Sequence, residues 1–279
     1  MKTLPHIIER LALDDDALRL VQLTDTHLCR ERGGRLLGMD TDHSLQCVIQ
    51  QLLQERPVTH LVLGTGDLAD NGAEAAYARL GDYFAQIPAP SFWLPGNHDA
   101  RAVMASSEAG AGRLCHEVRA GHWQILLLDS QIPGEVGGRL GASELQRLEQ
   151  ALASAAREGL HTLVCLHHHP VRIGCAWLDE QMVADAEAFF GVLDRFSGVR
   201  GVLWGHIHQE VDTYRKQVRL LGSPSTCVQF APGSEAFKAD DKPPGYRWLE
   251  LRSDGGLETG VSRVLDVRFD VDLASRGYL

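Results

Sequence analysis

Five short stretches of this chain combine histidine, aspartate and asparagine, and each stretch follows an apolar run. Imidazole nitrogen and carboxylate oxygen both bind borderline divalent ions such as iron, manganese and zinc, so these residue types could hold metal. The stretches are residues 23–27, 64–67, 93–99, 167–170 and 205–208. An isolated Gly-Asp turn or Asp-x-His pair is common without any metal. Five such stretches in one chain are far more specific, and we interpret them as parts of one metal centre.

Two pairs of side chains and one aspartate have a spacing that suits metal binding. Asp25 and His27 are two residues apart, as are His206 and His208. On an extended segment, side chains at positions i and i+2 point the same way, so each pair could reach one ion. Asp67 follows an apolar run and a glycine-containing turn, and its two carboxylate oxygens can bind two cations independently. These five side chains are candidate ligands, with Asp67 as a candidate bridge.

The other two stretches add an amide and further imidazoles. Asn97 and His98 come directly after a predicted strand that stops at Pro-Gly. Asn97 offers a neutral oxygen ligand, whereas His98 could protonate a leaving group or contact a phosphate. Among His167, His168 and His169 we expect one metal ligand, with the other two behind it or facing solvent.

Together the candidates comprise two aspartates, one asparagine and four or more histidines, with no cysteine. This number of ligands exceeds a single tetrahedral site, and the imidazoles disfavour calcium. Two divalent ions that share Asp67 are the simplest interpretation. Two cations about 3.5–4 Å apart suit hydrolytic phosphoryl chemistry, because they generate hydroxide near neutral pH and stabilise an in-line displacement.

Alternating strand and helix patterns would bring the five stretches to one place. Apolar, β-prone runs occupy residues 19–24, 60–64, 91–94, 123–129, 162–166 and 199–204, with shorter ones at 218–221, 226–230 and 247–251. Helical spacing covers residues 42–55, residues 182–193 and a segment between a candidate N-cap at Ser143 and Gly159. This order predicts an α/β fold in which ligands bind beyond the carboxyl ends of the strands. We expect a single domain over 1–279, with a core of about 18–252 and a C-terminal tail of 253–279, because no shift in composition marks a boundary.

Composition restricts the partners and the location of the protein. The 279 residues carry 27 Lys and Arg against 37 Asp and Glu, a net charge of −10 that disfavours binding to nucleic acid. No apolar run reaches the roughly 18 residues of a membrane span, so we expect no membrane partner. The first twenty residues are too acidic for a signal peptide, and we expect a cytoplasmic location. The six cysteines form no C-x-x-C pair, which favours reduced thiols.

The order Asp-x-His, Gly-Asp, Gly-Asn-His-Asp, His-His and Gly-His-x-His, over residues 20–230, resembles the signature of the calcineurin-like metallophosphoesterase superfamily. Further segments are similar to the bacterial class III 3′,5′-cyclic nucleotide phosphodiesterases, at residues 128–131, 167–171, 177–179, 205–210, 224–230 and 244–250. The resemblance implies a four-layer αββα sandwich, in which two mixed β-sheets are flanked by helices. It also implies hydrolysis of 3′,5′-cyclic AMP to 5′-AMP by attack of a metal-bridging hydroxide, which would lower the level of this second messenger.

The resemblance also implies a role for each candidate residue. The implied ligands are Asp25, His27 and His208 for the first ion and Asn97, His167 and His206 for the second, with Asp67 as the bridge. The implied substrate contacts are His27, Asp67, Asn97, His98 and His208, of which Asn97 and His98 are catalytic. His98 would stabilise or protonate the leaving 3′ alkoxide. Alignment on the downstream Pro-Val-x-x-Gly selects His167 as the ligand, whereas a simple His-x-Pro rule selects His168, and we expect His167.

Other functions share these motifs. A phosphodiesterase for another small diester, such as a glycerophosphodiester or a 2′,3′-cyclic nucleotide, would have the same metal site. A non-catalytic, metal-bound scaffold would lack ligands, and none of the family's ligands is missing from this sequence. We expect two ions per subunit, Fe²⁺ or Mn²⁺, while Zn²⁺ also accepts this ligand set. The oligomeric state stays open.

Overall fold

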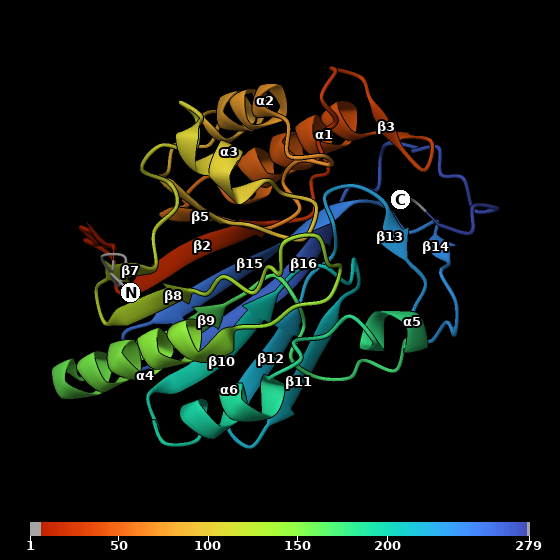
Figure 1. The fold of residues 1–279 in the computed structure, drawn as a ribbon. Helices are drawn as coiled ribbons and strands as arrows, with labels where there is room; N and C mark the ends of the chain where they lie inside the picture. Colours follow the sequence, from red (N-terminus) through yellow and green to blue (C-terminus); the bar gives the residue numbers. More distant parts are fainter. Residues whose placement is uncertain (1–6, 278–279) are drawn as a thin grey trace.

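In the computed structural model, which describes residues 7–277, two mixed β-sheets form the centre of the molecule (Figure 1). The seven-stranded sheet has the order β1 (Ile8–Leu11), β7 (Glu117–Ala120), β8 (Trp123–Leu127), β9 (His161–Cys165), β10 (Val199–Trp204), β12 (Val218–Gly222), β11 (Val211–Arg215). The five-stranded sheet has the order β16 (Leu257–Arg263), β15 (Gly245–Arg252), β2 (Ala17–Leu23), β5 (Leu61–Thr65), β6 (Ser91–Leu94). Strands β2, β5 and β6 are parallel, as are β8, β9, β10 and β12. The expected strands therefore form, and their parallel pairing directs their carboxyl ends to one edge of each sheet.

Helices cover the outer face of each sheet, so the expected four-layer sandwich is confirmed. Helices α1 (Thr41–Glu55), α2 (Glu74–Phe84) and α3 (Arg101–Ser106) lie on the side of the five-stranded sheet, and α4 (Gly141–Glu158) and α6 (Ala186–Leu193) on the side of the other sheet (Figure 1). Apolar residues of α1 and α2 pack against β2 and β5, and those of α4 and α6 pack against β8 to β10. A third cluster, which includes Leu20, Leu63, Ile125 and Leu163, fills the space between the sheets. This shared core holds the two sheets against each other.

Small elements surround the ends of the sheets. Two short ladders pair β3 (Arg35–Leu36) with β4 (Met39–Asp40) and β13 (Gln229–Phe230) with β14 (Ala239–Asp240). A single helical turn, α5 (Ala176–Asp179), lies near β13 (Figure 1). The predicted strand at 226–230 shrinks to Gln229–Phe230, because the Thr226 N–H donates to the carbonyl oxygen of Thr24 in the loop after β2, at 3.1 Å.

Helix α4 starts earlier than predicted. Its N-cap is Leu140, not Ser143, which lies inside the helix. The N–H groups of Leu140 and Gly141 donate to the two carboxylate oxygens of Asp185 at 2.9 and 2.7 Å, so a side chain 44 residues away takes the place of a local cap. The predicted end is confirmed, since Gly159 has the left-handed φ of 70° that commonly terminates a helix. The third helical pattern, over 182–193, is helical only from Ala186.

Both sheets include strands outside the expected core of about 18–252. β1 pairs with β7 at one edge of the seven-stranded sheet, and β16 pairs along its whole length with β15. Beyond β16, Phe269 and Val271 pack against the cluster that contains Leu36 and Met39, and the Asp272 N–H donates to the Leu37 carbonyl oxygen at 2.7 Å. Part of the expected tail is thus a sheet strand, and residues near its end pack on the loop around β3.

Two further expectations concern the cysteines and a membrane-spanning helix. All six cysteines, which lie within the described range, have free thiols, as predicted. Among the described helices, none combines the length and the apolar character that a membrane crossing needs.

Candidate metal centre

The five stretches meet at one point, beyond the carboxyl ends of β2, β5, β6, β9 and β10. Ligand atoms lie within 4.8 Å of one another in four overlapping groups: Asp25, His27 and His208; His27, Asp67 and His98; Asp25, Asp67 and His167; His167, His168 and His206. All of these residues are buried except His98, which is 9% exposed at its side chain. The structure therefore brings together every aspartate and histidine that the sequence singled out as a ligand or catalytic residue. Asp67 belongs to two of the groups.

The backbone at the site is left-handed, which the sequence did not indicate. Within residues 7–277, seven non-glycine residues have a positive φ, and five of them are Asp25, His27, Asp67, His206 and His208. We expected the two Asp-x-His and His-x-His pairs to lie on extended segments, and that expectation is wrong. Left-handed backbone costs about 1–3 kcal/mol per non-glycine residue and is concentrated at functional sites. The strain here falls on the side chains that converge.

Backbone hydrogen bonds between the loops hold this conformation. The Asp25 N–H donates to the Gly66 carbonyl oxygen at 3.0 Å, and the His27 N–H donates to the Asp67 carbonyl oxygen at 2.9 Å. Gly66 itself has a φ of 96°, and a Cβ on it would overlap the ring of His167. The loops after β2, β5 and β9 are therefore packed too closely for a larger residue at this position.

His208 is oriented as a metal ligand would be. Its Nδ1 lies 2.7 Å from the carbonyl oxygen of Val228. Because a carbonyl oxygen can only accept, Nδ1 carries the proton and Nε2 carries the lone pair. That Nε2 faces Asp25 Oδ1 at 3.3 Å and His27 Nε2 at 3.2 Å. A carboxylate oxygen and two imidazole nitrogens thus converge on a common place, where a cation would be favourable.

His167 shows the same arrangement on the other side of Asp67. Its Nδ1 donates to the carbonyl oxygen of Thr65 at 2.8 Å. Its Nε2 faces Asp67 Oδ2 at 3.1 Å and Asn97 Oδ1 at 3.2 Å. Nearby, His206 is 1% exposed, and neither of its ring nitrogens has a hydrogen-bond partner among the described residues. A buried imidazole without partners is costly in a protein interior. The side chains of Asp67, Asn97, His167 and His206 therefore offer a second group of ligand atoms that fits a divalent ion.

The three adjacent histidines have different environments. Both ring nitrogens of His168 are engaged, Nδ1 with Ser130 Oγ at 2.8 Å and Nε2 with the Val136 carbonyl oxygen at 3.0 Å. The ring of His169 stacks on that of His206 at 5.8 Å, and its Nε2 lies 3.9 Å from Asp179 Oδ1. Only His167 of the three directs a nitrogen at Asp67.

Electrostatics at the site couple Asp67 to the imidazoles. Burial alone would raise the pKa of Asp67, but the neighbouring rings of His167 and His98 hold it well below its usual value. Burial alone would lower the pKa of His167, but the carboxylate of Asp67 raises it to about 9. Burial, followed by the rings of His168 and His167, lowers the pKa of His206 well below its usual value. In the absence of an ion, a proton on His167 thus compensates the charge of Asp67.

His98 borders the group on its more exposed side. Its backbone N–H donates to Asp67 Oδ1 at 2.9 Å. Its Nδ1 donates to the carbonyl oxygen of Asp70 at 3.1 Å and lies 3.7 Å from Asp70 Oδ1. His27 Nδ1 is also 3.7 Å from Asp70 Oδ1. Asp70 was not singled out from the sequence, because no motif or spacing distinguishes it.

Asp99 is a second residue whose role the sequence did not reveal. Its carboxylate accepts hydrogen bonds from the N–H groups of Leu68, Ala69 and Gly96 at 3.2, 3.0 and 2.9 Å. The hydroxyl of Tyr77 in α2 donates to it at 3.0 Å. Burial, and then the charge of Asp67, raise the pKa of Asp99 to about 6. Asp99 therefore ties the loops after β5 and β6 to a helix, and its place in the Gly-Asn-His-Asp motif was the available signal.

The sequence model of the family described as calcineurin-like phosphoesterase matches residues 18–210, more than half of the chain. The chain belongs to the calcineurin-like phosphoesterase family. This assignment agrees with the resemblance found in the motifs and with the two groups of ligands around Asp67.

Several named relatives within the family are similar over almost the whole chain. The 3′,5′-cyclic adenosine monophosphate phosphodiesterase CpdA of Pseudomonas aeruginosa is 48% identical over 264 residues, which cover 95% of this chain and 96% of the relative. The CpdA protein of Escherichia coli K12 is 43% identical, over 94% of this chain and 95% of the relative. Among solved structures, a dimetal phosphatase from Danio rerio has a TM-score of 0.64 at 17% identity, over 88% of this chain and 99% of that one. That structure supports the family fold alone.

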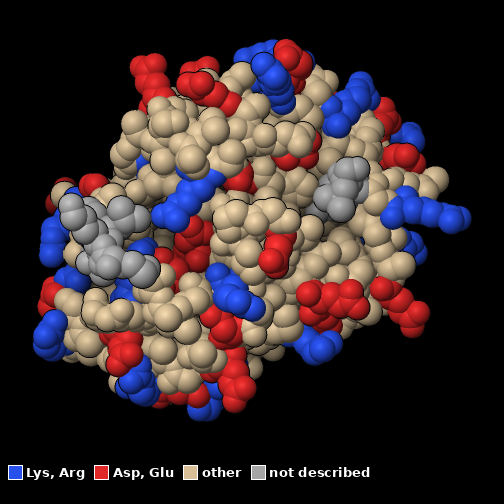
Figure 2. All heavy atoms as spheres, viewed as in Figure 1, with Lys and Arg blue, Asp and Glu red and all other residues tan. Residues whose placement is uncertain are grey.

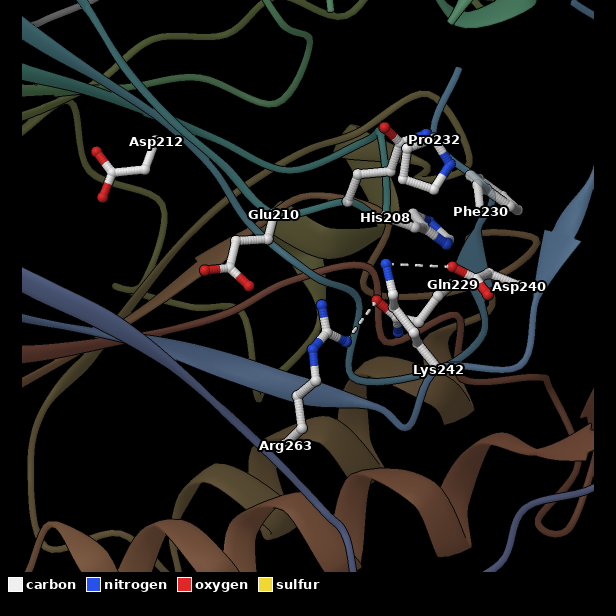
Figure 3. A pocket seen from close by; sticks show the side chains of 10 residues that line it. His208, Glu210, Asp212, Gln229, Phe230, Pro232, Asp240, Lys242 and Arg263 are labelled. Atoms are coloured by element: carbon white, nitrogen blue, oxygen red, sulfur yellow. Dashed lines mark hydrogen bonds and ion pairs between the residues drawn. The ribbon is translucent and has the colours of Figure 1, made fainter. Parts of the chain in front are cut away.

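A polar cavity of about 340 Å³ adjoins the family's His-x-His segment. Its lining residues include His208, Glu210, Gln229, Phe230, Lys242 and Arg263. Figure 3 shows Glu210 and Arg263 pointing toward one another, while Arg263 donates to Gln229 Oε1 at 3.3 Å. The ring of Phe230 stacks on that of His208 at 4.1 Å.

On the outer surface, acidic and basic side chains are interspersed across the face in Figure 2.

Proposed function

We propose that this protein hydrolyses 3′,5′-cyclic AMP to 5′-AMP with two divalent ions, and that it thereby lowers the level of this second messenger. The observation that carries the proposal is the combination of two ligand groups around Asp67 with relatives named as cyclic AMP phosphodiesterases that are 35–48% identical. Divalent ions follow from the family, whereas their identity is part of the proposal. Fe²⁺ or Mn²⁺ are the expected ions, and Zn²⁺ suits the same donors.

The residues of the site divide into two sets of ligands. The proposed ligands are Asp25, His27 and His208 for the first ion and Asn97, His167 and His206 for the second, with Asp67 shared. His208 Nε2 lies 3.3 Å from a carboxylate oxygen of Asp25, and His167 Nε2 lies 3.1 Å from one of Asp67, which supports this division. His168 is excluded as a ligand in this proposal, because both of its ring nitrogens already have partners. When bound, the two ions supply positive charge at the phosphate and lower the pKa of a water molecule.

The chain's own residues bind the phosphate and move a proton. His27, Asp67, Asn97, His98 and His208 are the proposed substrate contacts. The carbonyl oxygen of Asp70 holds the proton on His98 Nδ1, and the Asp70 carboxylate lies 3.7 Å from the same nitrogen. In the proposed reaction, the doubly protonated ring gives its Nε2 proton to the leaving 3′ oxygen, while the Asn97 amide nitrogen can donate to a phosphoryl oxygen. A small anionic substrate agrees with the net charge of −10 only because ions supply local positive charge. Nucleic acid and membranes are not proposed as partners, and the cytoplasm is the proposed location.

The direct test is a substrate panel with purified protein loaded with Mn²⁺ or Fe²⁺. The panel contains cyclic AMP, cyclic GMP, 2′,3′-cyclic AMP, glycerophosphocholine and single-stranded DNA. We expect the highest kcat/KM with cyclic AMP and 5′-AMP as the product. A higher kcat/KM with another diester would assign that diester as substrate, and inactivity on all of them with metal retained would indicate a scaffold.

A variant of His98 tests its catalytic role in the same assay, with a variant of His43 as the matched control. His98→Ala should keep both ions and lower kcat by about 10²–10⁴-fold, because it removes only proton transfer and a substrate contact. His43→Ala, which changes an exposed histidine in α1, should leave turnover unchanged. Wild-type turnover in the His98 variant would refute the role given to this residue.

A further inference from the structure

A chain of buried polar side chains lies between the two sheets, directly behind the metal centre. At its middle is Gln22 of β2, whose side chain is fully buried. Its Nε2 donates to Thr65 Oγ1 at 2.7 Å and to the Trp204 carbonyl oxygen at 3.2 Å. Thr65 is the last residue of β5, and Trp204 is the last residue of β10. A single amide therefore joins the ends of strands that belong to different sheets.

On the side of the site, this amide lies directly behind the loops that carry His167 and His206. The carbonyl oxygen of Thr65 accepts the Nδ1 proton of His167 at 2.8 Å. Trp204 precedes the Gly205-His206 pair, and the Gly205 N–H donates to the His167 carbonyl oxygen at 3.2 Å. Gln22 thus holds the backbone from which His167 and His206 take their positions.

The ligands of the other ion are held differently. Asp25 and His27 are fixed by their own backbone N–H groups, which donate to Gly66 and Asp67 at 3.0 and 2.9 Å. The Nδ1 of His208 donates to the Val228 carbonyl oxygen at 2.7 Å. The carboxylate of Asp25 also accepts the His206 N–H at 2.9 and 3.1 Å, but neither this bond nor those of His27 and His208 involve a side-chain atom of Gln22. Loss of its amide should therefore affect the two ion sites unequally.

On the inner side, the chain of bonds ends at a buried cation. Gln22 Oε1 accepts from the hydroxyl of Ser223, whose Oγ in turn accepts from Arg247 Nε at 3.1 Å. Arg247 is 1% exposed, and its other guanidinium nitrogens donate to Thr259 Oγ1 and to the carbonyl oxygens of Val211 and Gly222 at 3.2, 3.2 and 2.9 Å. The Trp204 carbonyl oxygen can only accept, so the Gln22 amide nitrogen faces it and Oε1 faces Ser223. The hydroxyl of Ser223 then donates to Gln22 while it accepts from Arg247, and the amide has only one orientation.

We propose that Gln22, oriented by Ser223 and Arg247, is a positioning residue for the second ion, the one assigned to Asn97, His167 and His206. Gln22 fixes the Thr65 carbonyl oxygen that keeps the proton of His167 on Nδ1, and it thereby directs Nε2 at Asp67. Partners of this kind, one step behind a ligand, typically change metal affinity by about 10- to 100-fold. The inference rests on the proposed two-ion function.

The test compares Gln22→Met with Gln124→Met. Gln124 lies in β8, is also fully buried, and donates to Glu117 Oε1 at 2.8 Å and to the Ala151 carbonyl oxygen at 3.2 Å, away from the site. Both variants remove one buried amide at nearly constant volume. Ions per chain are measured by elemental analysis after dialysis against increasing chelator, and unfolding of the metal-free proteins is measured in parallel.

We expect Gln22→Met to lose the second ion more easily than wild type and Gln124→Met do. The free-ion concentration at which this ion leaves should be about 10- to 100-fold higher in Gln22→Met than in the other two proteins. The first ion, assigned to Asp25, His27 and His208, should leave all three proteins at the same concentration, although both variants unfold more easily. Equal chelator curves for the two variants would overturn the proposal, since a merely structural amide would act that way.

A milder variant keeps the test decisive should Gln22→Met fail to fold. Thr65→Val removes the hydroxyl that Gln22 contacts and keeps the carbonyl oxygen that His167 needs. It should show the same selective loss of one ion, and retention of both at wild-type strength would overturn the proposal. A wild-type protein that binds fewer than two ions would instead refute the two-ion function, and this inference with it.

Discussion

At the residue scale, the site depends on imidazoles whose outer nitrogen is held by a carbonyl oxygen. His167 bonds to Thr65 and His208 to Val228, and each then directs Nε2 at a carboxylate oxygen. Residue types and spacing were enough to predict which side chains gather. They could not predict the left-handed backbone at Asp25 or Asp67, because local sequence carries no signal for a strained conformation that tertiary contacts impose.

The choice between adjacent histidines is also a residue-scale question. His167→Ala should lose one of two ions, because it removes the nitrogen that faces Asp67 Oδ2 at 3.1 Å. His168→Gln is the matched control and should keep both ions, since the His168 ring bonds only to Ser130 and Val136 in the hydrogen bonds described. Elemental analysis of the two purified variants measures this difference. The reverse pattern would assign the ligand to His168.

At the scale of elements, the strands were more predictable than the ends of the helices. The apolar runs at 91–94 and 199–204 coincide with β6 and β10, because strands buried on both faces are continuously apolar. Helix α4 differs at its start, where the cap is Asp185 and not the nearby Ser143. A cap supplied by a distant residue leaves no local pattern, so it could not be predicted from the sequence around the helix.

A pair of alanine variants tests this capping. Asp185→Ala should lower the free energy of unfolding by about 0.5–2 kcal/mol, because it leaves the N–H groups of Leu140 and Gly141 without their acceptor. Ser143→Ala, within the same helix, should change stability by much less. Urea denaturation of both variants gives the comparison, and a larger loss for Ser143→Ala would restore the sequence-based N-cap.

At the scale of the whole molecule, the metal centre belongs to both sheets. Asp25, His27 and Asp67 follow strands of the five-stranded sheet, whereas His167 and His206 follow strands of the seven-stranded sheet. The centre can form only when the leucine-rich core between the sheets is packed. The order of strands within each sheet depends on such long-range contacts, so local patterns could predict only that layered sheets would form. The four-layer sandwich was predicted from the motif resemblance. Ions that bind the folded chain alone would also stabilise this packing.

The central claim is that two ions share Asp67 in this pocket. Elemental analysis of the purified wild type and of Asp67→Ala, with circular dichroism to verify folding, tests it most directly. Two ions per chain in the wild type, and loss at both positions in the folded variant, are the predicted result. Full occupancy in the variant, or at most one ion in the wild type, would contradict the account.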